Sequence, residues 1–380
     1  MQTDFDIAIC GTGPVGLALA AMLIQRGTPA ASIVLIDAKT AEQSARDPRS
    51  IALSWGSRQL LEQLGAWPAS STAIEQIHVS RRGHFGRTLI DRNEYNLPAL
   101  GYVLRYGDIV SALEAQLKQS GMTIMRPASV VGITETGDAA SIALKAHPSI
   151  VAKLVVQAEG GLFNDQQPKQ LHRDYDQTAI VAHIHSDTPI PHRAFERFSD
   201  EGPLALLPQD DGYALVWCVR PNTARRLLAL NDQKFLSALS ESFGGRLGRF
   251  TAVSTRNAFP LGLNAHTVDQ KHIAVIGNAS QTLHPVAGQG LNLGLRDASV
   301  LAKLISSGLA SADVLKEFAD GRKQDRSVTI HLTDMMARAF ASTNAGSLPQ
   351  ALLGFSLGLV DGIAPAKKLL AEQMMFGRRA

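Results

Sequence analysis

The hydrophobic pattern of the N-terminal region predicts a strand, a helix and a second strand in close succession. Residues 5–10 form a short, mainly apolar run, and the glycine-rich stretch 11–16 follows it directly. A helical stretch then ends at Gly27, and residues 32–36 form a second apolar run that ends at Asp37. Short apolar runs bounded by turn residues indicate buried strands, and a strand–helix–strand unit of this kind predicts a parallel sheet.

A different pattern occupies the middle of the chain. Residues 193–198, 204–207 and 214–219 alternate or run apolar between turn residues, which indicates antiparallel strands. Residues 272–276 again form a short apolar run that indicates a buried strand. From Gly290 onward the apolar residues mostly have helical spacing. The sequence therefore predicts an α/β fold with a parallel sheet, an interleaved antiparallel sheet and a helical C-terminal segment.

We expect the corresponding domains to be discontinuous along the chain. The parallel-sheet domain is predicted over residues 1–68, 101–170 and 260–320. The antiparallel domain is predicted over residues 69–100 and 171–259, and the helical segment over residues 321–380.

Composition narrows the class of protein. Apolar residues make up 45% and charged residues 19% of the 380 residues, as in globular proteins. Lys and Arg total 37 against 34 Asp and Glu, which argues against a nucleic-acid-binding protein. Cys10 and Cys218 lie in separate apolar runs without metal-site spacing, and residues 1–6 lack the basic region of a signal peptide. We therefore expect a cytoplasmic protein without disulfides.

The glycines of the first turn have the spacing of a dinucleotide-binding loop. Gly11 permits a tight turn, Gly13 lets backbone amides approach a pyrophosphate, and Gly16 lets the helix pack close to the strand. Asp37 is placed to accept hydrogen bonds from a ribose. The alternative is a glycine-rich packing turn, and this motif alone does not separate NAD from FAD.

A second glycine-rich stretch, His284 to Asp297, reads HPVAGQGLNLGLRD. Together with the stretches 11–16, 47–54 and 202–208, it resembles the class A flavoprotein aromatic hydroxylases, and among them the hydroxylases of ubiquinone biosynthesis. The resemblance covers nearly the whole chain. Residues 50–67 look most like the members that act on a polyprenyl-methoxyphenol.

This resemblance implies an FAD-dependent monooxygenase that uses NAD(P)H and O₂. In that family a flavin C4a-hydroperoxide transfers oxygen to the electron-rich ring of a polyprenylated phenol, and no metal is needed. The resemblance also suggests membership of a ubiquinone-biosynthesis complex and a peripheral contact with the inner face of the membrane.

The residue types of the second loop suit a flavin. Gly288 and Gly290 allow backbone amides to approach the isoalloxazine ring, and the helix that begins there points its positive end at the ring. Arg49 and Arg105 match family positions near the cofactor, although surface ion pairs are the alternative for both. The cofactor-binding residues implied by the two loops and the resemblance are Gly11, Gly13, Pro14, Val15, Gly16, Asp37, Arg49, Arg105, Glu159, Gly277, Asn278, Pro285, Gly288, Gln289, Gly290, Leu291 and Asn292.

Two positions depart from the family pattern. Asn278 stands where the family has an aspartate that bonds the ribityl chain of FAD, and Glu159 stands where the family has a shorter aspartate. A charged hydrogen bond contributes about 1.5–3 kcal/mol and a neutral one about 0.5–1.5 kcal/mol, so Asn278 predicts weaker FAD binding by several-fold. Glu159 puts the use of the nicotinamide donor in question.

No catalytic side chain is identified with certainty by the sequence, and the candidates are His284 and Arg49, with a structural loop histidine as the alternative for His284. His183 and His185 alternate on a predicted strand without a third metal ligand, so we expect no metal. Trp217 and the stretch 259–261 line either an apolar substrate tunnel or an ordinary core. Lys367, Lys368, Arg378 and Arg379 mark either a lipid contact or a solvated helix end.

Two other classes of protein stay open at this point. A non-catalytic family member that acts as a scaffold would keep the fold but not the activity, and the altered Glu159 and Asn278 motivate that hypothesis. A plain NAD-dependent dehydrogenase would give no reason for the loop at 288–290.

Overall fold

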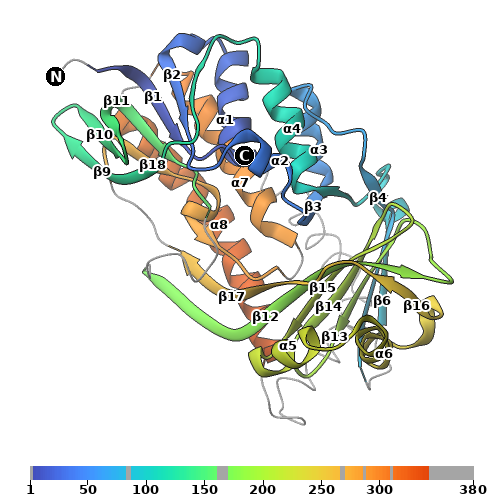
Figure 1. Ribbon diagram of the computed structural model, residues 1–380. Helices are drawn as coiled ribbons and strands as arrows, with labels where there is room; N and C mark the ends of the chain where they lie inside the picture. The colour runs from blue at the N-terminus through green and yellow to red at the C-terminus, as the bar shows by residue number, and fades with distance from the viewer. Residues whose placement is uncertain are drawn as a thin grey trace.

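The N-terminal βαβ unit is present as the sequence predicts. β1 (Phe5–Cys10) leads into α1 (Pro14–Gln25), and β2 (Ile33–Ile36) pairs parallel with β1, with Ile7 opposite Ile33. The computed structural model, drawn in Figure 1, describes residues 3–82, 87–160, 170–265, 270–285, 288–308 and 311–341.

Within the described residues, β1 belongs to a seven-stranded sheet with the order β8-β2-β1-β11-β10-β9, in which β18 also pairs with β11. The added strands are β8 (Thr123–Met125), β9 (Val130–Thr136), β10 (Ala139–Leu144), β11 (His147–Gln157) and β18 (Ile273–Val275). β8, β2, β1, β11 and β18 run parallel. β9, β10 and β11 pair antiparallel at one edge of this sheet. We expected parallel strands in this region, and that expectation is wrong for β9 and β10.

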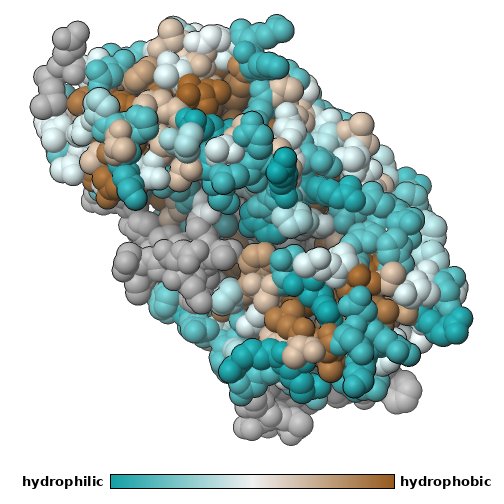
Figure 2. Space-filling view, in the orientation of Figure 1, coloured by the Kyte–Doolittle hydropathy of each residue, from teal (hydrophilic) through white to brown (hydrophobic). Residues whose placement is uncertain are grey.

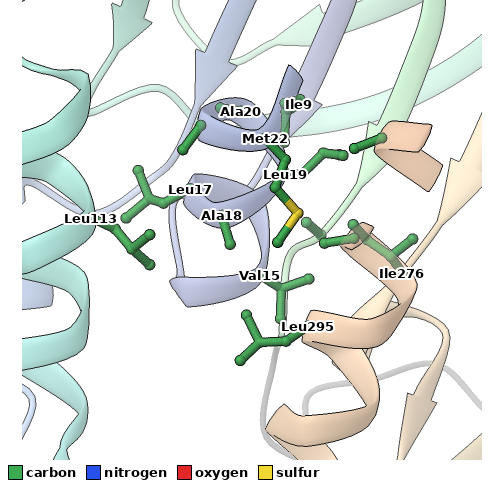
Figure 3. Packing of buried hydrophobic residues seen from close by; sticks show 14 of the residues in the cluster. Ile9, Val15, Leu17, Ala18, Leu19, Ala20, Met22, Leu113, Ile276 and Leu295 are labelled. Carbon is green, nitrogen blue, oxygen red and sulfur yellow. The ribbon is translucent and has the colours of Figure 1, made fainter. Parts of the chain in front are cut away.

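Helices cover one face of this sheet. They are α1, α3 (Trp55–Gln63), α4 (Tyr106–Leu117), α7 (Gln289–Ile305) and α8 (Ser311–Ala341); the short α2 (Ala41–Ala45) lies beside α4. α1 is apolar all round and is buried from Pro14 to Leu23. Figure 3 shows why: Leu17 points toward Leu113 of α4, and Val15 lies beside Leu295 of α7. This packing fixes the N-terminal end of α1 against that of α7.

A nine-stranded sheet, counted within the described residues, forms the second lobe (Figure 1). Its order is β19-β17-β12-β15-β14-β13-β5-β6, and β16 pairs with β12. The strands are β5 (Gln76–Arg81), β6 (Arg87–Asp91), β12 (Leu171–Ser186), β13 (Arg193–Phe198), β14 (Pro203–Gln209), β15 (Gly212–Val219), β16 (Phe250–Val253), β17 (Asn257–Ala265) and β19 (Gln281–Thr282). All neighbours are antiparallel except β13 and β5.

The antiparallel sheet continues past the boundary that we placed after residue 259. β17 pairs with β12 from Asn257 to Ala265, and β19 adds a further strand from the flavin-loop region. A three-stranded sheet of β3 (Ser50–Ser54), β7 (Gly101–Arg105) and β4 (Thr72–Ile74) lies at the junction of the two lobes. The two lobes are therefore joined by shared strands and not by a single linker.

One face of the large sheet packs against α5 (Pro221–Leu228) and α6 (Asp232–Phe243). Trp217 lies in this core with its ring 5.8 Å from that of Phe235. Trp217 is thus an ordinary core residue, and the substrate-tunnel alternative for it is wrong. The opposite face of the sheet is turned toward the first lobe.

The long helix α8 ties the lobes together. Arg322 on α8 forms an ion pair with the buried Asp297 of α7 at 2.7 Å. Further along α8, Asp334 pairs with Arg173 of β12 at 2.6 Å and accepts a hydrogen bond from the Tyr175 hydroxyl at 2.8 Å. In Figure 1, α8 runs from the first lobe toward the second.

The surface in view is mixed in character. Figure 2 shows mostly polar side chains on this face, with apolar side chains gathered in separate patches on the two lobes. No helix within the described part of the chain is both long and apolar enough to cross a membrane. The basic residues at 367–379 lie outside the described residues.

Candidate functional site

A large cavity of about 760 Å³ lies between the lobes. Its walls come from the first glycine turn, from β3, from the second glycine loop and from the open face of the antiparallel sheet. A volume of this size is in the usual range for cofactor and substrate pockets, which is 300–1,000 Å³. The two glycine-rich loops, which are far apart in the sequence, therefore open into the same space.

The first glycine turn has the tight geometry that a pyrophosphate cradle needs. Gly11 has φ +110°, and a methyl group built on it would lie 2.7 Å from the backbone of Ala158. A methyl group on Gly16 would lie 2.0 Å from the carbonyl oxygen of Gly11, so α1 starts directly against the turn. Backbone amides at a helix N-terminus attract phosphate groups. These residues fit the dinucleotide part of FAD.

Asp37 lies at the end of β2 and faces this turn. Its Oδ2 atom accepts hydrogen bonds from the amide and the hydroxyl of Thr12, at 2.6 and 2.8 Å, and Oδ1 accepts one from the Lys39 amide at 2.8 Å. Because Asp37 also lines the cavity, its carboxylate both orders the turn and lies where a ligand in the cavity can reach it. The position predicted from the sequence therefore has the expected geometry.

The second loop closes around the start of α7. Gly277 and Gly288 both have φ +59°, a conformation that favours glycine, and Gly288 is the N-cap of α7. A methyl group on Gly288 would lie 3.2 Å from Cβ of Ala52 in β3. Backbone of the loop thus faces β3 at close range, and Pro285, Gly290 and Leu291 line the cavity beside it. This is the part of the cavity that suits a flat ring.

Asn292 holds this loop in place instead of facing the cavity. Its Oδ1 atom accepts hydrogen bonds from the Ser54 amide at 2.9 Å and the Ser57 hydroxyl at 2.7 Å. Its Nδ2 atom donates to the carbonyl oxygens of Ala52 at 3.2 Å and Gly288 at 2.7 Å. The side chain fastens α7 to β3, so any part that Asn292 has in cofactor binding is indirect.

Arg49 lines the cavity next to β3 and is held by two neighbours. Its guanidinium contacts the carboxylate of Asp47 at 2.8 Å and lies over the ring of Tyr106, 4.5 Å from the ring centre. Burial would lower the pKa of Arg49, but the hydrogen bond and charge of Asp47 raise it above its ordinary value. Arg49 therefore stays a fixed cation and is suited to electrostatic stabilisation, not to proton transfer.

Glu159 and Asn278 face the cavity from the ends of β11 and β18. The pKa of Glu159 is raised, first by partial burial and second by the negative charge of Asp37. Asn278 approaches the glycine after Glu159, because a methyl group on Gly160 would lie 3.0 Å from Cβ of Asn278. The two positions that depart from the family pattern are thus close neighbours in the structure.

His284 is buried where the second loop meets the antiparallel sheet. Its Nε2 atom lies 2.9 Å from Oε1 of Gln177, and its ring packs edge-on against Tyr175 at 5.3 Å. Gln177 donates its own Nε2–H to the carbonyl of Glu201, so its Oε1 atom is the acceptor and His284 donates. Burial lowers the pKa of His284 to about 3. A ring that stays neutral at physiological pH favours the structural alternative over an acid role.

The structure brings most of the predicted residues to the cavity and leaves others outside it. The lining residues among them are Gly11, Gly13, Pro14, Val15, Asp37, Arg49, Glu159, Asn278, His284, Pro285, Gly288, Gly290 and Leu291. Gly16, Arg105, Gly277, Gln289 and Asn292 are not among its described lining residues. The Arg105 guanidinium pairs with Asp210 at the surface, which supports the ion-pair alternative for this residue.

His183 and His185 lie side by side with ring centres 4.8 Å apart. His185 faces Asp211 at 3.6 Å, and His183 contacts the carbonyl of Gln209. Within the ranges that the structure describes, no group of three or more His, Cys, Asp or Glu side chains could hold a metal ion.

Sequence reasoning missed several residues of the site. The ring of Tyr106 stacks against the Arg49 guanidinium. Its hydroxyl oxygen would lie 2.7 Å from a methyl group built on Gly13. Burial raises the pKa of Tyr106 to about 12, so its hydroxyl stays protonated. Glu196 on β13 also lines the cavity. The alternation of residues 193–198 was the available signal for Glu196, while nothing in the sequence linked Tyr106 to Gly13.

Comparisons with known proteins agree with this geometry. Residues 4–327 match the protein family described as FAD binding domain. The chain is 30% identical to the ubiquinone hydroxylase UbiL of Rhodospirillum rubrum, over 97% of this chain and 89% of that protein. It is 30% identical to the 3-demethoxyubiquinol 3-hydroxylase of Escherichia coli, over 93% of this chain and 98% of that protein.

Solved structures share the fold. The p-nitrophenol 4-monooxygenase PnpA from Pseudomonas putida superposes with a TM-score of 0.77 at 17% identity, covering 100% of both chains. The family match spans most of the chain, and relatives named as ubiquinone hydroxylases align along nearly all of it. The chain belongs to the FAD-dependent hydroxylase family of ubiquinone biosynthesis.

Proposed function

We propose that this protein hydroxylates the aromatic ring of a polyprenylated phenol, a precursor of ubiquinone, with NAD(P)H as electron donor and O₂ as oxygen source. One observation carries the proposal: the cavity is continuous from the first glycine turn, past the second glycine loop, to the open face of the antiparallel sheet. A cofactor held by both loops would thus meet a substrate held by the sheet.

Bound FAD would supply the redox chemistry, namely acceptance of a hydride from NAD(P)H and activation of O₂ for transfer to an electron-rich ring. The protein's own residues bind and orient the reactants. The amides at the start of α1 would hold the pyrophosphate, and the N-terminal end of α7 would place positive potential at the ring. Arg49, fixed by Asp47 and Tyr106, adds a permanent positive charge beside them.

The antiparallel sheet provides the substrate surface. Ile77, Ala194, Ala205, Leu207 and Val216 line the cavity and give it an apolar wall. Such a wall suits a prenyl chain and excludes water from the reacting ring. We infer from the similarity of residues 50–67 that the substrate is a methoxyphenol that occurs late in the pathway.

The proposal also includes where the protein acts and with which partners. A prenylated substrate is stored in the membrane, so we propose a peripheral contact with the membrane surface on its cytoplasmic side. We also propose that the protein works within a complex of ubiquinone-biosynthesis enzymes. Both rest on the chemistry of the substrate and on the resemblance to the family.

The test is a turnover assay on the purified protein. With FAD, NADPH, ¹⁸O₂ and a short-chain 2-prenylphenol, mass spectrometry should detect a product that carries one ¹⁸O atom. A protein that binds flavin, with bands at about 375 and 450 nm, but hydroxylates no prenylated phenol would favour the scaffold hypothesis instead. A protein that stays colourless with excess FAD would contradict both.

A further inference from the structure

Arginine side chains gather on one face of the antiparallel sheet, where β13, β5 and β6 pair side by side. Arg197 of β13 lies opposite Ser80 of β5, and Ser80 lies opposite Arg87 of β6. Residues that pair directly across a sheet point to the same face, so the two arginines flank Ser80 on one face. The Arg197 Nε atom donates to the Ser242 carbonyl in the last turn of α6 at 3.1 Å, which shows that this is the face that carries α6.

Two more arginines complete the group. Arg246 follows α6, and a guanidinium nitrogen of Arg246 lies 3.4 Å from Nδ1 of His78, in the next row of the same face. Arg82 follows β5, and its amide donates to the Phe198 carbonyl at 2.9 Å, so Arg82 lies beside the end of β13. We call Arg82, Arg87, Arg197 and Arg246 the arginine patch.

The positive charges of the arginine patch are not compensated by acidic side chains. Within the described ranges, no member of the patch forms an ion pair. Burial lowers the pKa of Arg197, and the positive charges of Arg246 and Arg82 lower it further. Burial and then the charge of Arg246 lower the pKa of His78 to about 4, so this ring is neutral at physiological pH. The guanidinium groups therefore repel one another and attract an anion.

The arginine patch is open to solvent and has an apolar neighbour. Arg82, Arg87 and Arg246 are exposed, and Arg197 is half-buried. Leu89 lies two residues after Arg87 on the same face of β6, and 39% of its surface is exposed. Basic side chains around an exposed apolar one are typical of surfaces that bind anionic membranes, because the apolar group enters the headgroup region while the cations meet the phosphates.

We propose that the arginine patch is the surface through which this protein docks on a membrane of anionic phospholipids. The inference rests on the peripheral membrane contact within the proposed function and names the surface that makes this contact. Guanidinium groups bind phosphate oxygens through paired, charge-assisted hydrogen bonds. Charges that repel one another in solution are thus stabilised when phosphate headgroups lie against them.

The test is co-sedimentation of the full-length, FAD-loaded protein with two kinds of vesicle, one of phosphatidylcholine alone and one of equal parts phosphatidylcholine and phosphatidylglycerol. The unmodified protein should bind the anionic vesicles at least about tenfold more tightly than the neutral ones, and added salt should release it. Each arginine near an anionic surface contributes about fivefold in binding, so Arg87→Gln combined with Arg246→Gln should weaken binding to the anionic vesicles roughly thirtyfold. Binding of this variant to neutral vesicles should not change.

Two other double variants remove the same amount of charge elsewhere. Arg26→Gln with Lys118→Gln changes exposed residues at the C-terminal ends of α1 and α4, and its binding should stay within about twofold of the unmodified protein. Arg378→Gln with Arg379→Gln changes the basic C-terminal residues, which are the other candidate for a lipid contact.

Three results would overturn the inference. The first is equal binding of the unmodified protein to both kinds of vesicle, and the second is an equal loss of binding in the first-lobe variant. The third is a loss of binding in the C-terminal variant while the patch variant binds as the unmodified protein does.

Turnover of a soluble, short-chain 2-prenylphenol separates this inference from the proposed activity. The patch variant should keep the unmodified rate with this probe, because no member of the arginine patch is among the described residues that line the cavity. Hydroxylation without binding to anionic vesicles would overturn only the docking surface. Binding to anionic vesicles with bound flavin but without hydroxylation would overturn only the proposed activity.

Discussion

The carboxylate of Asp37 is bonded to Thr12 through both the amide and the hydroxyl, at 2.6 and 2.8 Å. This contact joins the end of β2 to the glycine turn after β1 and sets the shape of the turn before any ligand binds. The turn faces the same cavity as the loop at the start of α7. Preorganised groups bind with a smaller entropic cost, so the architecture is that of a ready cofactor site.

Substituting Gly16 by alanine should weaken both the fold and the site. The new methyl group would lie 2.0 Å from the Gly11 carbonyl oxygen, so α1 must move away from the turn. We expect a loss of about 1–3 kcal/mol in the free energy of unfolding, as for other overpacked sites, and weaker FAD binding. Urea denaturation and FAD titration measure the two effects.

Gly132→Ala is the matched control, because a methyl group there meets nothing within 4 Å. That variant should behave like the unmodified protein. If Gly16→Ala also left the free energy of unfolding and the FAD affinity unchanged, the close contact between α1 and the turn would not exist in solution.

Asn278→Asp should tighten FAD binding several-fold. The aspartate restores the charged acceptor that the family resemblance implies at this position, and the difference between a charged and a neutral hydrogen bond is about 1 kcal/mol. Asn278 lines the cavity next to Gly160, so the change acts at the ligand. Titration of the apoprotein with FAD, followed by flavin fluorescence, gives the dissociation constants. An unchanged or weaker affinity would show that Asn278 does not contact the ribityl chain.

Asp297→Asn should strongly destabilise the first lobe. Asp297 is buried, accepts from Arg322 at 2.7 Å and Arg326 at 2.9 Å, and lies beside the Gly277 amide. Removing one partner of a buried ion pair leaves uncompensated charge and costs about 3–5 kcal/mol. Chemical denaturation checks this value. Asp313→Asn, at the exposed start of α8, is the control and should cost less than about 1 kcal/mol, the size of an exposed charge–dipole contact at a helix N-terminus.

The pH dependence of stability should report on His284. Its pKa is about 3 in the folded chain, against an ordinary value of 6.5. As the pH falls below about 6.5, the unfolded chain takes up a proton that the folded chain does not. Stability therefore decreases by about 1.4 kcal/mol per pH unit from this residue alone. The contribution is absent at higher pH.

His284→Gln removes this titration while keeping a side chain that can donate to Gln177. Between about pH 5 and 6.5, its unfolding free energy should fall less steeply than that of the unmodified protein. His147→Gln, an exposed residue on β11, serves as the control and should keep the original slope. Equal slopes in all three proteins would mean that His284 is protonated in the folded state.

The glycine positions were predictable because their requirement is local. The turn at Gly11 and the cap at Gly288 depend on backbone angles and close approach, which a single short motif encodes. The βαβ unit formed by β1, α1 and β2 was predictable from the same local patterns of apolar and glycine residues. The position of Asp37 was predictable because it follows the strand that pairs with β1, so its side chain lies next to the glycine turn.

The roles that the sequence did not decide depend on packing between distant segments. Arg105 ends β7 on the side that faces Asp210, and no sequence pattern indicates which way a strand-end side chain points. Asn292 fits the flavin-loop motif, yet its hydrogen bonds to β3 give it a supporting role. Trp217 and Val216 are neighbours in β15 on opposite faces, and only the position of α6 decides which one is core.

The central claim is that one FAD molecule spans both glycine loops, and a crystal structure of the protein with FAD tests it most directly. The account predicts electron density for the ribose next to Asp37, the pyrophosphate over Gly11 to Gly16, and the isoalloxazine ring in the cavity beside Gly290 and Leu291. Density for FAD at one loop only, or side chains that fill the space between the loops, would contradict it.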